Sequence, residues 1–214
     1  PAPLQPLLSE RRVGEGLWTP VGEDLSKVDD GPTPVFYRTF LRPSKDWDKR
    51  HVEVIAWDPR RVQLNMRAGT REPRPQTANR GDGRIPRGTG ELGRVVAAFN
   101  GGFQTTHTSF GMMVDKKLLL APRNYGATVA LLDDGRPAFG AWMPRAEVPA
   151  SLVSFRQNLQ PLLEDGKFNP YHRKRFGNHV NVAGARNGWT VRSALCYTAP
   201  GHLIYLYAHY ANER

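Results

Sequence analysis

The sequence predicts an α+β fold: a β-rich domain of mixed sheets with few helices. Apolar and polar residues alternate with period two in several short segments, as in strands that bury one face. Glycine and proline are plentiful, with 21 and 18 residues, and they separate these segments as turn residues do. Only the segment from Ser151 to Leu159 is typical of a helix, and Pro161 limits its length.

The first candidate strands follow an irregular beginning. Residues 1–33 are rich in proline, glycine and charge and predict an irregular lead-in, after which a single domain spans 34–214. Aromatic and β-branched residues predict one strand, and period-two alternation predicts two more: Pro34–Leu41, His51–Asp58 and Arg61–Arg67. The turn residues between the last two predict that they form a hairpin.

The middle of the chain predicts a long loop between strands. Residues 68–93 are polar and lack periodicity, so we interpret them as a loop that is either functional or mobile. Arg94–Phe99 is short and apolar and predicts a strand that returns to the core. Two hairpins follow, one in Phe110–Leu120 that turns near Asp115, and one in Ala127–Trp142.

The last predicted hairpin pairs Thr190–Thr198 with His202–Ala208 around Pro200-Gly201. Arg214 comes soon after this core-quality strand. We therefore expect that the domain lacks its C-terminal closing elements, which a second chain or a missing segment would supply. A natural terminal edge strand is the alternative.

Composition narrows the classes of partner. The 214 residues carry a net charge of +10, which favours anionic partners, although plentiful arginine alone would give the same charge. The charges are dispersed, which counts against a nucleic-acid binder. No stretch approaches the roughly 20 apolar residues of a membrane span. The single cysteine, Cys196, lies in an apolar run that favours a buried hydrophobe over a nucleophile.

The strongest local motif is Asn100-Gly101-Gly102, directly after an apolar segment. Paired glycines let backbone amides approach a ligand oxygen, and Asn100 offers both a donor and an acceptor. An ordinary Asn-Gly turn is the alternative. His107, shortly afterwards, is the histidine best placed for acid–base chemistry.

A second candidate group lies near the C-terminus. Arg192 stands among apolar strand residues, where it is either solvated or directed inward at a phosphate or carboxylate. Trp189, close by, could flank a sugar. We find no cofactor motif and no zinc spacing. A divalent cation stays open: Asp133 and Asp134 could serve calcium, but a turn is the favoured interpretation.

Four segments follow one another along the chain: Ala97–Phe103, Gly111–Asp115, Gln157–Lys167 and Val191–Ala194. In this series they resemble the phosphodiester glycosidase family, and the resemblance extends from about Val35 to Ala208. The Asn-Gly-Gly-Phe element is moderately specific, and the other segments carry weight through their order. Family members usually continue beyond the arginine strand with a helix and an Asp-Gly-Gly-Gly segment, which this sequence does not contain.

The resemblance implies hydrolysis of a sugar phosphodiester or a related anionic glycan linkage. It implies that Asn100, Gly101 and Gly102 line the pocket and that Arg192 contacts an anionic group. We add Phe103 and Ser193, which stand in the same motifs, as substrate-binding residues.

Two other functions stay open. One is a non-catalytic carbohydrate or cell-envelope binding domain on the same fold, and the other is a basic nucleic-acid binder. For the hydrolase and the carbohydrate-binding domain, the expected ligand is an anionic carbohydrate. We expect an extracytoplasmic location, with secretion or anchoring through a segment outside this sequence.

Overall fold

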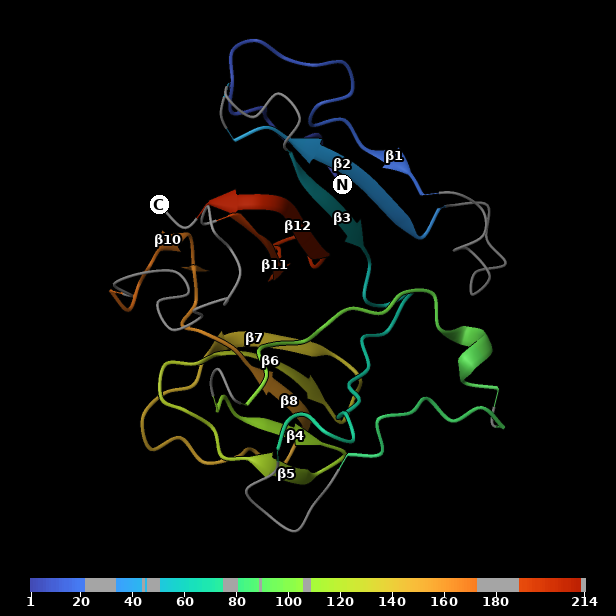
Figure 1. Ribbon diagram of the computed structural model, residues 1–214, viewed down its shortest axis with the longest axis vertical. Helices are drawn as coiled ribbons and strands as arrows, with labels where there is room; N and C mark the ends of the chain where they lie inside the picture. Colours follow the sequence, from blue (N-terminus) through green and yellow to red (C-terminus); the bar gives the residue numbers. More distant parts are fainter. Residues whose placement is uncertain are drawn as a thin grey trace. The chain divides into compact units, whose positions relative to one another are not determined.

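The computed structural model describes residues 1–21, 34–43, 45, 51–74, 81–88, 90–105, 109–172 and 189–212. The chain is divided into two compact units. Unit 1 comprises Pro1–Val62 and Val182–Arg214, and unit 2 comprises Gln63–Asn181. Each unit has its own five-stranded antiparallel sheet, as Figure 1 shows.

The sheet of unit 1 joins strands from both ends of the chain. Its order is β1 (Thr19–Pro20), β2 (Phe36–Leu41), β3 (Val52–Trp57), β12 (Leu203–Asn212) and β11 (Trp189–Tyr197). Phe36 and Trp57 are cross-strand partners in this sheet, with ring centroids 5.8 Å apart. The strands predicted over Pro34–Leu41 and His51–Asp58 and the C-terminal hairpin are confirmed.

The strand predicted over Arg61–Arg67 is wrong. The Asp58 turn does form, with the Arg61 N–H donating to the Asp58 carbonyl over 3.0 Å. Both edges of β3 are already paired, however, one with β2 and the other with β12. No edge is left for a local hairpin partner, and the chain passes into unit 2 after Val62.

The lead-in contains the two-residue strand β1 and is fastened to β2 by backbone hydrogen bonds. The Leu4 N–H donates to the Gly16 carbonyl over 2.9 Å, and the Gly16 N–H donates to the Phe40 carbonyl over 3.1 Å. Gly16 has a φ of +78°, and a Cβ there would lie 2.1 Å from the Leu4 oxygen. Only glycine therefore fits where the lead-in meets the sheet.

The sheet of unit 2 has the order β5-β4-β8-β6-β7. These strands are β4 (Met112–Val114), β5 (Lys117–Leu120), β6 (Ala127–Leu132), β7 (Pro137–Ala141) and β8 (Leu152–Gln157). Both hairpins predicted between Phe110 and Trp142 are confirmed. A separate small hairpin pairs β9 (Leu163–Glu164) with β10 (Lys167–Phe168) across an Asp165-Gly166 turn.

The helix predicted over Ser151 to Leu159 is wrong, because this segment forms the central strand β8. Its backbone pairs with β4 on one side and β6 on the other. Phe155 and Gln157 are both 0% exposed. Pairing on two edges and burial of alternate side chains outweigh the local helical pattern.

The strand predicted over Arg94–Phe99 is also wrong. A short 3-10 helix, η2 (Leu92–Arg94), ends at the first residue of this segment, and residues 95–100 have no regular structure. Val95 is 42% exposed and Phe99 is 39% exposed, so burial supplies no driving force for a core strand.

The β-rich fold with few helices is confirmed. In the described part of the chain, the strand pairings are antiparallel and η2 is the one helical element. No helix among the described residues is long and apolar enough to cross a membrane.

Candidate functional site

The predicted site residues are divided between the two units. Unit 2 contains the segment Asn100–Phe103, and unit 1 contains Trp189, Arg192 and Ser193 on β11. His107 lies outside the described residues. Each sequence motif therefore lies within a single unit.

The Asn100–Phe103 segment begins with a side-chain turn. The Gly102 N–H donates to Asn100 Oδ1 over 3.1 Å, which is the geometry of an Asx turn. Asn100 and Gly101 are exposed, whereas Gly102 and Phe103 are half-buried. The Asn-Gly turn weighed from the sequence is thus present, and its first two residues face solvent.

Arg156, on the central strand β8, supports this segment from below. Its Nη2 donates to the Phe103 carbonyl over 2.8 Å. Its Nη1 donates to the carbonyls of Phe110 and Gly111 over 2.8 and 3.3 Å. One guanidinium thereby joins the sheet to both Phe103 and the residues that lead into β4.

Gly102 packs directly against this guanidinium. A Cβ at Gly102 would lie 2.9 Å from Arg156 Nη2 and 3.0 Å from Nε. A Cβ at Gly101 would lie 3.7 Å from Arg156 Cγ, which is an ordinary contact. The second glycine of the pair is therefore required for close approach to Arg156, and the first is not.

Glu72 holds the segment at a second point. Its Oε2 accepts hydrogen bonds from the Thr105 N–H over 2.8 Å and from the Thr105 hydroxyl over 2.5 Å. The Thr105 hydroxyl also accepts a hydrogen bond from the Arg74 N–H over 2.8 Å. The hydrogen bonds from Thr105 hold the pKa of Glu72 below its ordinary value.

The charge of Arg156 is compensated only weakly. Among the described residues, no carboxylate lies within ion-pair distance of its guanidinium, which contacts carbonyl oxygens instead. Burial lowers the pKa of Arg156, and the more distant Glu72 carboxylate opposes that shift. A partly buried cation behind an exposed loop makes the loop a favourable place for an anion.

The other predicted site residues lie on β11 in unit 1. Arg192 is half-buried, its Nη1 donates to the Val191 carbonyl over 3.1 Å, and burial lowers its pKa. Ser193 is exposed and lies opposite Tyr207 in the register. Trp189 begins the strand. Arg192 and Ser193, as neighbours on a strand, point to opposite faces of the sheet.

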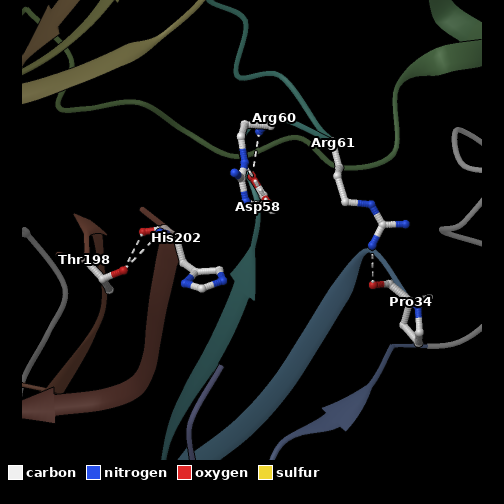
Figure 2. Close-up of polar contacts among 6 residues, drawn as sticks. All are labelled: Pro34, Asp58, Arg60, Arg61, Thr198 and His202. Atoms are coloured by element: carbon white, nitrogen blue, oxygen red, sulfur yellow. Dashed lines mark hydrogen bonds and ion pairs between the residues drawn. The ribbon is translucent and has the colours of Figure 1, made fainter. Parts of the chain in front are cut away.

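Figure 2 shows the polar contacts at the end of β3 and at the β11–β12 turn. The Arg60 guanidinium binds Asp58 through Nη2 and Oδ2 over 2.6 Å, and this hydrogen bond holds the pKa of Asp58 below its ordinary value. The Thr198 hydroxyl donates to the His202 carbonyl over 3.2 Å and accepts from the His202 N–H over 3.0 Å. Thr198 thus closes the turn through backbone groups, and its hydroxyl is not activated by the imidazole.

Other candidates from the sequence have structural roles. Asp134 accepts hydrogen bonds from the Arg136 N–H over 2.9 Å and from its Nε over 2.6 Å, as a turn residue does. Cys196 is half-buried, and burial raises its pKa, which disfavours the thiolate. Within the described ranges, no three His, Cys, Asp or Glu side chains gather as a metal site requires.

Sequence reasoning missed Arg156 and Glu72. Arg156 lies inside the segment predicted to be a helix, where an arginine is expected to face solvent. The available signal was its position between Phe155 and Gln157 in a run short enough to be a buried strand. Comparison of the chain with protein-family models, with curated proteins and with solved structures finds no match.

Proposed function

We propose that this protein is a hydrolase acting on a glycosyl phosphodiester or a related anionic glycan linkage. The observation that supports it best is the Asn100–Phe103 segment, an exposed glycine turn held over the partly buried guanidinium of Arg156. Fixed backbone dipoles above a weakly compensated cation favour a bound anion, and a phosphodiester is an anion at neutral pH.

In this proposal the loop binds the phosphate and stabilises negative charge that develops on its oxygens. Water attacks the anomeric carbon and gives up a proton, the bond from that carbon to the phosphate oxygen breaks, and the departing phosphate monoester takes up a proton. The sequence assigns the proton transfer to His107. The Asn100 side-chain amide and the Gly101 N–H contact the anion, since the Gly102 N–H already donates to Asn100 Oδ1, and Arg156 acts through the loop as a positioning residue.

The test is hydrolysis of a soluble glycosyl phosphodiester by the full chain, with the released sugar measured. We expect Asn100→Ala to lower kcat/KM by about 100-fold. Arg136→Ala is the matched control, because that side chain is 75% exposed and serves a turn. It should leave the rate unchanged.

The outcomes separate the hydrolase from its rival. Binding of the phosphodiester without release of sugar over long incubation would contradict hydrolysis and favour a non-catalytic carbohydrate-binding domain. Hydrolysis that survives Asn100→Ala would remove the loop from the reaction. Arg156→Lys keeps the charge but not the three-carbonyl geometry, so it should raise KM while the protein stays folded.

A further inference from the structure

Two tyrosines in unit 2 form an aromatic pair apart from the Asn100–Phe103 segment in the sequence. The ring centroids of Tyr125 and Tyr171 lie 5.2 Å apart, with 37° between the ring planes. Tyr125 is 37% exposed and Tyr171 is half-buried. The pair therefore presents aromatic surface to solvent rather than filling the core.

Tyr125 adopts a backbone conformation that bulky residues avoid. Its φ is +59°, in the left-handed region where glycine and asparagine are favoured. The Tyr125 N–H donates to the Trp142 carbonyl over 2.6 Å, which holds the residue at the end of the β6–β7 hairpin. A strained aromatic residue at an exposed position calls for a role other than packing.

A buried glutamine fixes the turn that carries Tyr125. Gln157 Oε1 accepts from the Arg123 N–H over 2.7 Å, and Gln157 Nε2 donates to the Arg123 carbonyl over 3.2 Å. The same side-chain amide accepts a hydrogen bond from the Gly111 N–H and donates one to the Thr128 hydroxyl. A Cβ at Gly126 would lie 3.0 Å from Gln157 Cδ, so the turn sits closely on this amide.

Tyr171 is fixed by a carboxylate. The Tyr171 hydroxyl donates to Glu164 Oε2 over 2.6 Å, and Glu164 Oε1 accepts from the Ala141 N–H over 2.8 Å. Ala141 belongs to β7, which is an edge strand of the sheet. The Tyr171 ring is thus oriented by polar contacts to the sheet, and the turn that carries Tyr125 is fixed through its backbone, before any ligand arrives.

We propose that Tyr125, Tyr171 and Glu164 form a binding site for an uncharged pyranose ring. Tyrosine rings offer rigid apolar faces for the C–H face of a sugar, and a carboxylate accepts hydrogen bonds from its hydroxyls. Two aromatic rings and a carboxylate could also hold an organic cation. The net charge of +10 disfavours a cation, and the choice of a sugar rests on the proposed function.

The experiment titrates the isotope-labelled full chain with cellotriose, chitotriose and maltotriose, and with choline as the cationic probe. Backbone NMR shifts report which residues respond. We expect at least one trisaccharide to move the signals of Tyr125, Gly126 and Tyr171 at millimolar concentration. Tyr125→Phe keeps the ring and should bind as the wild type does.

Tyr125→Asn separates binding from folding. Asparagine tolerates the left-handed conformation, so the turn should keep its structure while losing the ring. The saccharide Kd should rise about tenfold. Wild-type affinity in Tyr125→Asn, no response to any trisaccharide, or a response at these residues to choline alone would each overturn the proposal.

Hydrolysis of the phosphodiester is measured in the same preparations. Saccharide binding without hydrolysis would retain this site and reject the hydrolase. Hydrolysis without saccharide shifts at Tyr125 would retain the hydrolase and reject this site. The two proposals therefore fail separately.

Discussion

Each unit of the protein contains an arginine that is buried or partly buried, and the two arginines have different partners. In unit 1 the Arg42 side chain is 7% exposed and pairs with Glu15, whose side chain is 0% exposed. Arg42 donates to this carboxylate from Nε over 3.0 Å and from its backbone N–H over 2.9 Å. In unit 2, Arg156 contacts carbonyl oxygens of Phe103, Phe110 and Gly111.

The difference separates a structural charge from one that can act on a ligand. Glu15 neutralises the charge of Arg42, so this buried pair has no net charge. The same carboxylate also accepts a hydrogen bond from the Arg12 N–H over 3.1 Å. Carbonyl dipoles satisfy the hydrogen bonds of Arg156 without cancelling its charge. A residual positive field is therefore expected at the Asn100–Phe103 segment and not at the lead-in.

Breaking the pair in unit 1 should have the largest effect on stability. Glu15→Ala leaves Arg42 buried without its counter-charge, which costs about 3–5 kcal/mol. Hydrogen exchange followed by mass spectrometry should show the loss in peptides of β2 and the lead-in. Asp58→Ala is the control: its partner Arg60 is 85% exposed, so we expect a cost below about 1 kcal/mol. Equal costs in the two variants would contradict the contrast.

The same pair predicts loss of stability in acid. Burial raises the pKa of Glu15, but the hydrogen bonds from Arg42 and Arg12 outweigh it, and the pKa lies below the ordinary value of 4.5. A carboxyl with a depressed folded pKa contributes stability above its unfolded pKa and loses it as pH falls through the folded value. Protection in the lead-in should therefore decline below about pH 4.5 in the wild type and not in Glu15→Ala.

The stability of unit 2 should depend more on the neutral side-chain amide of Gln157 than on a buried ion pair. Gln157→Leu leaves the Gly111 and Arg123 amides without their acceptor, at a cost of about 2–4 kcal/mol. Chemical unfolding followed by exchange in β8 and the Arg123–Gly126 turn measures it. Because a side-chain amide does not titrate, the contribution of Gln157 to stability should be the same at about pH 4 and at about pH 7. A strong acid dependence of the Gln157 contribution would show that the two units are less different than proposed.

How far the sequence predicts the fold depends on how local each element is. The hairpins β4–β5 and β6–β7 are fixed by neighbouring residues: Asp115 and Lys116 both adopt positive φ, as a two-residue hairpin turn requires. The strand β8 is different, because its partners β4 and β6 precede it and pair on both sides. Local periodicity cannot report that pairing, and a helix was predicted instead.

The candidate site divides in the same way. The Asn-Gly turn, which the sequence offers as the alternative to pocket lining at Asn100–Phe103, is recognisable because its side-chain hydrogen bond spans two residues. Its support was not predicted, because Arg156 is 53 residues from Phe103 and Glu72 is 33 from Thr105. A single sequence carries a turn signal in adjacent residues, but it does not show which distant carbonyls a strand arginine will contact.

The two glycines of the loop test whether Arg156 holds the loop in a fixed position. Gly102→Ala puts a methyl group 2.9 Å from a guanidinium tied to three carbonyls, so we expect a cost of about 1–3 kcal/mol. Gly101→Ala makes an ordinary contact at 3.7 Å and should change stability by less than about 0.5 kcal/mol. Thermal unfolding of the pair measures the difference. Equal effects would mean that Arg156 moves aside freely and does not fix the loop.

A smaller effect than at Glu15, Gln157 or Gly102 is expected at Glu72, whose carboxylate opposes the pKa shift of Arg156 without contacting it. Glu72→Gln weakens the two hydrogen bonds from Thr105 and should lower local stability at neutral pH by about 1 kcal/mol. The pKa of Glu72 lies below its ordinary 4.5, so its contribution is present above that value and is lost as pH falls through the folded pKa. Exchange at Thr105 should therefore converge between wild type and variant in acid.

Glu72→Gln also removes the carboxylate that, among the described residues, opposes the pKa shift of Arg156. If the residual charge of Arg156 attracts the ligand, the variant should bind inorganic phosphate slightly more tightly while its loop becomes less protected. Thr105→Val is the matched control, since it weakens the same anchor and keeps the carboxylate. Tighter phosphate binding in both variants would trace the effect to loop mobility, and tighter binding in Glu72→Gln alone would trace it to charge.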